Sequence, residues 1–251
     1  MFDPLDKQRL DLEEAVRETF DRWSIEGLAD GMERRHRDIT EKLFARMAPQ
    51  PDDRLLEIGC GDGWAARLVA PLALDGAVVG IDVSGEMIAR ARERSADLDN
   101  VLLAPGAAEE IPWAEDYFTH VYSIEAAYYF PDPDRAAREI FRVATYGGRF
   151  WILINFYAEN AASHDWPAEV GLTMHLKSAD EWVEIFRAAG FAEVAVDRIV
   201  DETSIPERYE GEALRRRQEL QRNGGLLITG VKPGSPPRPP RAEPSAFPIL
   251  G

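Results

Sequence analysis

Apolar runs and amphipathic segments alternate along most of the chain, from residue 54 to residue 232. The apolar runs predict strands near 54–58, 77–82, 101–104, 119–124, 148–155, 192–199 and 226–232. The segments between them predict helices near 64–70, 85–95, 135–144, 179–189 and 206–222. Strands that alternate with helices form a parallel sheet with right-handed crossovers, so the pattern predicts an α/β fold with helices on both faces of the sheet.

The two ends of the chain have different patterns. Apolar residues recur near helical spacing between residues 5 and 47, which predicts two helices separated at Gly27 and Gly31. Residues 233–251 are rich in proline and have no periodic apolar pattern, which is typical of a disordered tail. We therefore expect an N-terminal helical segment over 1–50, a main domain over 51–232 and a tail over 233–251.

Composition and charge narrow the possible functions. The chain has 251 residues, 45% of them hydrophobic, which excludes wholesale disorder and suits one α/β domain. No run approaches the ~20 apolar residues of a membrane span, and the polar N-terminus predicts no signal peptide. The single cysteine, Cys60, excludes an internal disulfide framework and leads us to expect a reducing, cytoplasmic location. A net charge of −16 argues against nucleic-acid binding, because binding phosphates requires a basic face.

The segment from Arg54 to Gly63, RLLEIGCGDG, carries the strongest chemical signal. An apolar run is followed by glycines at alternate positions, and the next apolar run ends in Asp82. A buried strand, a glycine turn, a helix start and a second strand ending in an acid make up half of a doubly wound nucleotide site. The glycines allow the backbone to approach a ligand, and Asp82 is able to accept both hydrogen bonds of a ribose diol. The segment therefore predicts an adenosine-containing cofactor.

The glycine spacing distinguishes between two classes of cofactor. A dinucleotide site requires G-x-G-x-x-G, whereas the third glycine here, Gly63, comes one residue early. Glu57 lies two residues before the first glycine, and an acid there orders the turn and places negative charge near a cation. This arrangement favours a sulfonium amino acid over a pyrophosphate. An NAD-dependent oxidoreductase is accordingly the weaker alternative.

These residues resemble the class I S-adenosylmethionine-dependent methyltransferases, in particular the small-molecule branch that includes the ubiquinone and menaquinone biosynthesis C-methyltransferases. The resemblance extends over roughly residues 40–232 and is carried, besides the glycine turn, by residues 78–92, 106–113 and 118–150. The chain departs from the family at Thr119, where an Asp is usual, and residues 156–178 do not align with it. The resemblance implies S-adenosylmethionine as the cofactor. It also implies a Rossmann-like seven-stranded sheet with the last strand antiparallel beside strand five, and an N-terminal helical lid.

The same resemblance assigns the cofactor contacts. The glycine turn, residues 59–63, would hold the amino-acid part, Asp82 the ribose and the 107–109 loop the adenine, with Met87 under the adenine ring. Two lid residues, Trp23 and Met32, would cover the cofactor, and an aromatic ring beside a sulfonium gains cation–π attraction. The full set of expected cofactor residues is Trp23, Met32, Glu57, Gly59, Cys60, Gly61, Gly63, Asp82, Val83, Met87, Ala107, Ala108, Glu109, Ser123 and Ile124.

Residues 156–178 follow strand five and contain two of the four histidines. Long loops at an active edge are often functional, so we expect this one to form the pocket of the methyl acceptor, with Glu125, Tyr128 and Tyr129 opposite. His164 and His175 are the candidate general bases and Tyr128 a further catalytic candidate. The expected lining of this pocket is Tyr128, Tyr157, His164, Trp166 and His175.

Other polar residues receive a plainer interpretation. His36 on a helix and His120 inside a strand are poorer candidates for the base. The basic cluster at residues 215–217 is interpreted as a solvated helix face. No spacing of Asp, Glu and His matches a known set of metal ligands, so no metal site is predicted.

Two functions from different classes follow. The first is methyl transfer to a small-molecule acceptor, with the methylated atom, O, N or C, left open. The second is a regulatory or interaction protein that binds S-adenosylmethionine without methyl transfer. An acceptor cavity next to the cofactor discriminates between them, because a binder has no need of one. The sequence makes no prediction of oligomeric state.

Overall fold

The computed structural model describes residues 4–234, so the predicted disordered tail lies outside the described residues from position 235 onward. One seven-stranded sheet runs through the molecule, with strand order β3-β2-β1-β4-β5-β7-β6. Its strands are β1 (Arg54–Ile58), β2 (Ala77–Asp82), β3 (Val101–Pro105), β4 (Phe118–Ile124), β5 (Ala144–Ile154), β6 (Ala192–Ile199) and β7 (Gly225–Val231). The first five are mutually parallel, and β7 is antiparallel to both β5 and β6. This confirms the predicted sheet with its last strand antiparallel beside strand five.

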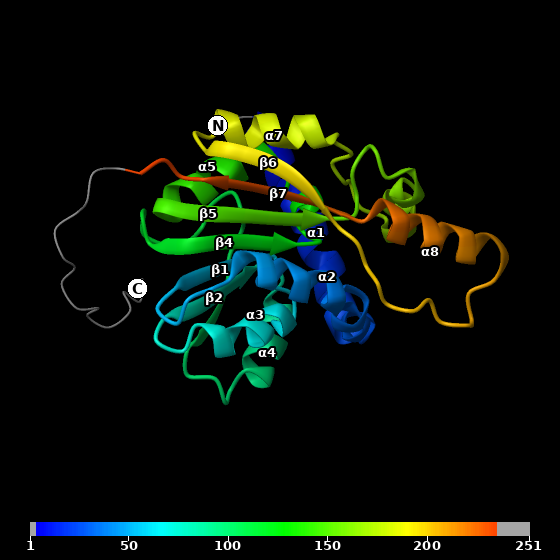
Figure 1. Ribbon diagram of the computed structural model, residues 1–251, viewed down its shortest axis with the longest axis horizontal. Coiled ribbons are helices and arrows are strands. Elements are labelled where there is room, and N and C mark those ends of the chain that lie inside the picture. The colour runs from blue at the N-terminus through cyan, green and yellow to red at the C-terminus, as the bar shows by residue number, and fades with distance from the viewer. Residues whose placement is uncertain (1–3, 235–251) are drawn as a thin grey trace.

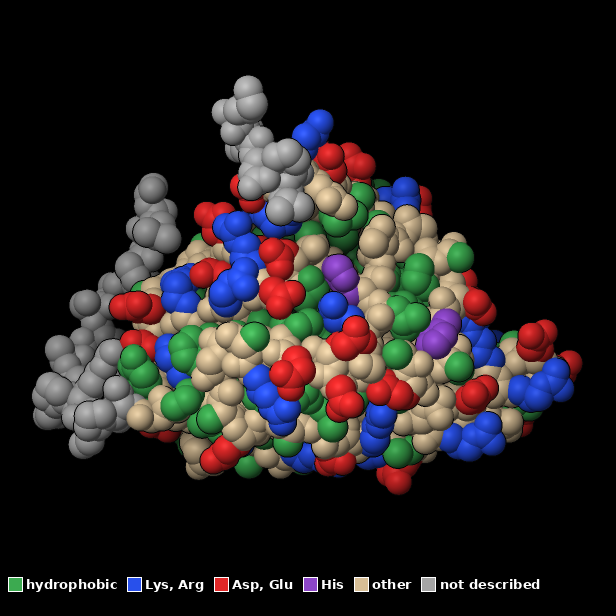
Figure 2. All heavy atoms as spheres, turned by 90° about the horizontal axis from the view of Figure 1, so that it is seen from above, with side chains coloured by type: hydrophobic (Ala, Val, Ile, Leu, Met, Phe, Trp, Pro, Cys, Tyr) green, Lys and Arg blue, Asp and Glu red, His purple; other side chains and the backbone are tan. Residues whose placement is uncertain are grey.

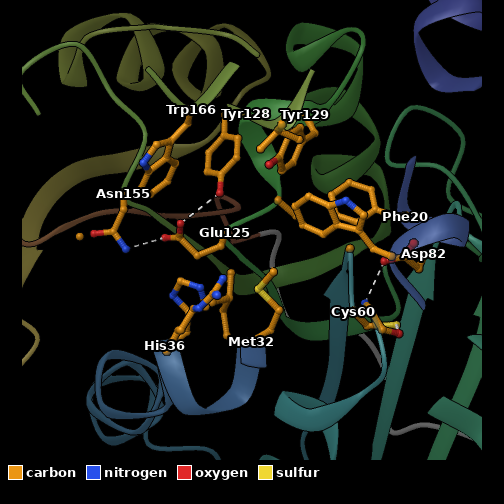
Figure 3. A pocket seen from close by; sticks show the side chains of 18 of the residues that line it. Phe20, Met32, His36, Cys60, Asp82, Glu125, Tyr128, Tyr129, Asn155 and Trp166 are labelled. Carbon is orange, nitrogen blue, oxygen red and sulfur yellow. Dashed lines mark hydrogen bonds between the residues drawn. The ribbon is translucent and has the colours of Figure 1, made fainter. Parts of the chain in front are cut away.

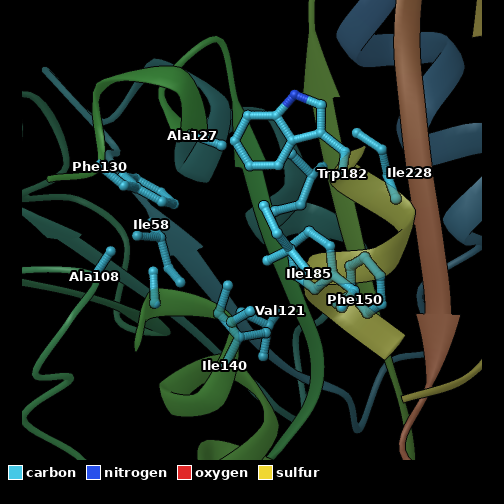
Figure 4. Packing of buried hydrophobic residues seen from close by; sticks show 14 of the residues in the cluster. Ile58, Ala108, Val121, Ala127, Phe130, Ile140, Phe150, Trp182, Ile185 and Ile228 are labelled. Atoms are coloured by element: carbon cyan, nitrogen blue, oxygen red, sulfur yellow. The ribbon is translucent and has the colours of Figure 1, made fainter. Parts of the chain in front are cut away.

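Helices cover both faces of the sheet, as predicted (Figure 1). They are α1 (Pro4–Ile25), α2 (Met32–Met47), α3 (Trp64–Val69), α4 (Gly85–Arg94), α5 (Pro133–Val143), α6 (Trp166–Val170), α7 (Ala179–Ala188) and α8 (Gly211–Asn223). Helices α5 and α7 pack with one apolar cluster, part of which is drawn in Figure 4. Within this cluster Phe150 stacks on Phe186 with ring centroids 4.0 Å apart. Helices α2, α3 and α4 pack with a second cluster on the other face. Burial on both faces explains why the central strands are almost continuously apolar.

The boundary of α8 differs from the prediction. The helix begins at Gly211 rather than near residue 206, because Pro206 starts a turn closed by the Tyr209 N–H on its carbonyl. No residue of α8 is fully buried, and the helix extends beyond the ends of the strands, beside the segment that contains α6 (Figure 1). Its inner face is consequently available to line a cavity.

Charged side chains of both signs lie on the described surface. On the face seen in Figure 2, acidic and basic side chains are interspersed and form no continuous basic stripe. Within residues 4–234, no helix has both the length and the apolarity needed to cross a membrane. The same residues contain no group of three or more His, Cys, Asp or Glu side chains placed to hold a metal ion.

Candidate functional site

The carboxyl ends of β1, β2, β4 and β5 open into one cavity of about 550 Å³, covered by α1, α2 and α8. Parallel sheets place ligand sites at this edge, where strand order reverses between β1 and β4. One part of the cavity, the glycine half, is lined by Gly59, Gly61, Asp82 and Met87. The other part, the α8 half, is lined by Glu125, Tyr128, Asn155, Trp166 and residues of α8. Figure 3 shows Asp82 and Cys60 on one side of the cavity and Asn155 and Trp166 on the other.

The glycine turn brings bare backbone to the cavity. Gly59, Gly61 and Gly63 all have positive φ, a conformation that favours glycine. A β-carbon on Gly59 would meet the Ala126 methyl at 2.4 Å, and one on Gly63 would meet the Ala91 methyl at 3.0 Å, so those glycines serve the packing of the fold. A β-carbon on Gly61 would meet no protein atom within 4 Å. Gly61 is therefore the position where the open space is available to a ligand.

Asp82 is held at the end of β2 by backbone donors. Its Oδ2 accepts from the Gly61 N–H at 2.8 Å, and its Oδ1 accepts from the Ser84 N–H at 2.9 Å. Burial raises the pKa of this carboxyl, and the two N–H donors oppose the rise. Because each carboxylate oxygen accepts more than one hydrogen bond, both atoms retain acceptor capacity toward the cavity. The carboxylate is thus pre-oriented for a diol.

Glu57 lies under the turn and is only 3% exposed. The Tyr122 hydroxyl donates to its Oε2 at 3.2 Å. Burial raises the pKa of Glu57 to about 8, so the carboxyl holds its proton at neutral pH when nothing is bound. A cation placed nearby would lower that pKa, and only then would Glu57 carry the negative charge expected from the sequence.

The N-terminal helices cross the mouth of the glycine half. Phe20 on α1 packs edge-on against Tyr129 with centroids 5.2 Å apart, and Trp23 lines the same side. Asp21 ties α1 to the start of α4, because its Oδ1 accepts from the Ser84 hydroxyl at 2.6 Å and from the Glu86 N–H at 3.2 Å. Ser84 follows Asp82 by two residues, so this tether lies directly beside the predicted ribose site.

Glu125 is the central polar group of the α8 half. It follows β4 with φ of +55°, a left-handed conformation that is uncommon for a non-glycine residue and clusters at functional sites. Its N–H donates to the Leu153 carbonyl at 2.8 Å, which holds this backbone in place. Its Oε2 accepts from the Tyr128 hydroxyl at 3.1 Å and its Oε1 from Asn155 Nδ2 at 3.0 Å (Figure 3). Burial raises its pKa to about 8, against the effect of these donors.

His36 on α2 is the histidine that lines the cavity, contrary to its low ranking from the sequence. It points into the α8 half from the side opposite Glu125 (Figure 3). Burial, and then the positive charges of Arg35 and Arg217, lower its pKa to about 4, so the ring is neutral at neutral pH. Arg35 is next to His36 on α2, whereas Arg217 comes from α8. The sequence around His36 therefore gave no sign that Arg217 would lie near it.

The loop after β5 corrects the expected acceptor pocket. His164 is exposed and its Nε2 lies 3.1 Å from the Ala158 carbonyl, and neither it nor His175 lines the cavity. The His175 N–H donates to the Tyr128 carbonyl at 2.9 Å, so this segment braces Tyr128 from behind. The Tyr157 hydroxyl donates to the Gly224 carbonyl at 3.0 Å and serves packing. Of the predicted lining, Tyr128 and Trp166 reach the cavity.

The basic cluster at residues 215–217 also differs from its interpretation as a solvated face, because Arg216 and Arg217 line the cavity while Arg215 is exposed and does not. Among the expected cofactor residues, the cavity is lined by Trp23, Met32, Glu57, Gly59, Cys60, Gly61, Asp82, Val83, Met87, Ala108, Glu109 and Ile124. It is not lined by Gly63, Ala107 or Ser123, and the Ser123 hydroxyl instead donates to the Ile58 carbonyl at 2.8 Å.

Comparison with known proteins identifies the family of the chain. The Methyltransferase domain family matches residues 56–152, from β1 into β5. The 27-O-demethylrifamycin SV methyltransferase of Amycolatopsis mediterranei is 31% identical over 196 residues, which cover 73% of this chain and 71% of that protein. The chain belongs to the class I S-adenosylmethionine-dependent methyltransferases. S-adenosylmethionine is accordingly the cofactor of this chain.

Further relatives of the chain include a longer plant protein and a solved archaeal complex. The chloroplastic 2-methyl-6-phytyl-1,4-hydroquinone methyltransferase of Arabidopsis thaliana is 29% identical over 189 residues, which cover 74% of this chain. The chain spans about half the length of that relative. Among solved structures, the complex between the Haloferax volcanii Trm112 methyltransferase activator and a methyltransferase contains a chain 35% identical to this one. Its TM-score is 0.80, with 85% of this chain and 97% of that chain covered.

The residues of the glycine half fit S-adenosylmethionine. Gly61 leaves open space where a backbone must meet a ligand, and Asp82 offers two fixed acceptors for the ribose hydroxyls. Met87 and Ala108 are buried residues that add apolar surface to the cavity lining, which suits a flat base. Glu109 is largely engaged in the fold, since its Oε1 accepts from the Asp132 N–H at 3.0 Å.

Replacing Gly61 by Ala tests this fit. We expect S-adenosylhomocysteine binding to weaken by about tenfold, or ~1.4 kcal/mol, because the new methyl occupies the ligand's space. Gly147→Ala is the matched control, since Gly147 also has positive φ and open surroundings but lies at the start of β5, far along the strand from the cavity. In both variants the new alanine has a positive φ, so we expect both to lose ~1–2 kcal/mol of stability in thermal unfolding. Equal calorimetric affinities in the two variants would place the cofactor away from Gly61.

Proposed function

We propose that this chain transfers a methyl group from S-adenosylmethionine to a small-molecule acceptor bound in the α8 half of the cavity. The observation that carries the proposal is the continuity of one cavity between two different sets of groups. Gly61 and Asp82 stand at one end, and Glu125 with Tyr128 and Asn155 at the other. When bound, the cofactor supplies a methyl group activated by its sulfonium.

The chain's own contribution is mainly alignment. In-line displacement is accelerated by holding acceptor and methyl in register, which rigid side chains do best. Glu125 is held by two hydrogen bonds and a fixed backbone, so its carboxyl presents a defined acceptor to a hydroxyl, amine or activated carbon. Above a pH of about 8 it is ionised and able to take the acceptor's proton. Burial raises the pKa of Tyr128 well above its usual value, so its hydroxyl stays a donor to Glu125.

The N-terminal helices complete the proposal as a lid. Residues 1–50 would cover the cofactor held by residues 51–232, with Phe20, Trp23 and Met32 excluding water from it. The tether from Asp21 to Ser84 supports this role, because it links α1 to the residues next to Asp82. The expected cytoplasmic location stays a prediction.

The alternative is a protein that binds S-adenosylmethionine without methyl transfer. The α8 half argues for the enzyme, because its aromatic wall and polar cluster form a second compartment beyond the cofactor residues. Relatives named for methylating a hydroquinone and a rifamycin also support a small-molecule acceptor.

Mass spectrometry with deuteriomethyl-labelled cofactor tests the proposal. The full chain is incubated with a panel of hydroxyaromatic, quinol and amine acceptors, and products are searched for the labelled methyl mass. We expect at least one labelled product, formed with an equal amount of S-adenosylhomocysteine. Binding of S-adenosylhomocysteine without product from any acceptor would favour the non-catalytic alternative.

A further inference from the structure

Three arginines converge on the α8 half of the cavity. Arg35 comes from α2, and Arg216 and Arg217 come from α8. Arg35 and Arg217 both act electrostatically on His36, which places their charges around that ring. The chain as a whole carries a net charge of −16, and acids outnumber arginines along the whole cavity, so the three arginines form a local basic cluster in the α8 half.

The acids of the α8 half neutralise only part of this charge. Arg216 Nη1 is 2.5 Å from Glu169, and Arg217 Nη2 is 3.0 Å from Asp201. Within residues 4–234, Arg35 makes no ion pair or hydrogen bond, and the buried Nη2 of Arg216 has no hydrogen-bond partner. Arg35 is an exposed side chain whose charge no described acid pairs, and Arg217 uses only its Nη2 for Asp201, so both arginines retain donors for a ligand.

The remaining acids near this half do not cancel that charge. Glu125 has its pKa raised to about 8 by burial and is protonated at neutral pH. Glu13, which reaches the cavity from α1, is paired with Arg9 at 3.1 Å. Asp82 and Glu57 belong to the glycine half. The three arginines exceed the two acids that pair with them, Glu169 and Asp201, by one positive charge, which a ligand with a single negative charge would balance.

An apolar wall adjoins these arginines. Trp166 and Val170 of α6 face the cavity, and Ala213 and Leu220 reach it from α8. The Arg216 contact with Glu169 joins the two helices at the wall's edge. A ligand that fills this half would have an apolar body against the wall and its charged end beside His36.

We propose that the methyl acceptor is a monoanionic amphiphile, whose carboxylate is bound by Arg35 and Arg217 beside His36 while its apolar body packs against Trp166 and Leu220. This inference rests on the proposed function and names its substrate class. The arginines are specificity residues in this account, whereas Glu125 is the group nearest the reacting atoms.

Calorimetry with matched acids and amides tests the proposal. The probes are 4-hydroxybenzoate, 6-hydroxy-2-naphthoate and laurate, each paired with its carboxamide and titrated with S-adenosylhomocysteine present. We expect at least one acid to bind about tenfold or more tightly than its amide. The acid should also raise the pKa of His36, followed by NMR, whereas the amide should leave it unchanged.

Variants locate the effect. Arg35→Gln and Arg217→Gln should each remove most of the preference for the acid. Arg34→Gln and Arg215→Gln are the matched controls, because each is a sequence neighbour that does not line the cavity, and Arg34 is exposed as Arg35 is; these variants should keep the preference. Affinity for S-adenosylhomocysteine should be unchanged in all four, which also verifies that they fold.

Three results would overturn the proposal. In the first, no acid binds more tightly than its amide. In the second, the preference for the acid survives in both Arg35→Gln and Arg217→Gln. In the third, Arg35→Gln loses affinity for S-adenosylhomocysteine. The last would assign Arg35 to the cofactor's own carboxylate. If the protein prefers the acids but methylates no acceptor of the mass-spectrometry panel, the anion site stands and the proposed function is refuted. Failure of the anion site and failure of the proposed function are therefore distinguishable.

Discussion

Glu125→Gln should lower methyl-transfer turnover about 10²–10⁴-fold if Glu125 takes the acceptor's proton, with S-adenosylhomocysteine affinity unchanged. The substitution keeps the shape of the side chain and one acceptor for Asn155 Nδ2, but removes the ionisable group. Because the pKa of Glu125 is raised to about 8, wild-type turnover should rise with pH through about 8 and then level off. The variant should lack that rise.

Two further variants sharpen this result. Tyr128→Phe removes a hydrogen bond that lowers the pKa of Glu125, so the rise in turnover should move to higher pH. Glu93→Gln, on the exposed face of α4, is the matched control and should behave as wild type. Full turnover with an unchanged pH profile in Glu125→Gln would mean that alignment alone carries the reaction.

Glu125 also predicts how stability depends on pH. Its pKa in the folded chain, about 8, is above its ordinary value of 4.5, so the folded state binds the proton more tightly. The proton on Glu125 makes its full contribution to the free energy of unfolding below about pH 4.5, and this contribution is lost as the pH rises through about 8. Glu125→Gln should remove this part of the stability loss, measured by denaturant unfolding between pH 5 and 9.

Asp82→Ala should weaken binding of S-adenosylhomocysteine by roughly 10–150-fold, the equivalent of ~1.5–3 kcal/mol for hydrogen bonds to a charged group. The variant loses the diol acceptor and also leaves the Gly61 and Ser84 N–H groups without their partner. Because the contact is to the ribose, 5′-methylthioadenosine, which lacks the amino-acid part, should lose a similar factor.

Calorimetric titration of both ligands measures this loss. Asp97→Ala, an exposed aspartate on the loop after α4, is the control and should bind like wild type. An Asp82→Ala variant with wild-type affinity for both ligands would show that the ribose lies elsewhere.

The glycine half was predictable because its groups are close together in sequence. Gly59, Gly61 and Asp82 lie on consecutive strand ends, so a strand-turn-helix pattern places them without knowledge of the rest of the fold. Glu125 and Asn155 also follow strands directly, and their position just after β4 and β5 was the available signal. Their hydrogen bond, between residues 30 apart, required the register of β4 on β5.

The α8 half was less predictable because distant segments build it. Arg216 and Arg217 reach the cavity because α8 folds back on the loop after β5, where Asn223 Nδ2 donates to Asn160 Oδ1 at 2.8 Å. The same loop turns His164 outward through its contact with the Ala158 carbonyl. Helical spacing alone gives no sign of which arginine of a basic run faces inward, and a histidine count gives no sign of orientation.

A crystal structure with S-adenosylhomocysteine bound is the most direct test of the central claim, that one cavity joins a cofactor site to an acceptor site. We predict the ribose hydroxyls on Asp82 and the sulfur at the boundary of the two halves, its open side directed at Glu125 and Tyr128. A sulfur directed away from Glu125, or a cofactor that fills the α8 half and contacts Arg217, would contradict the account.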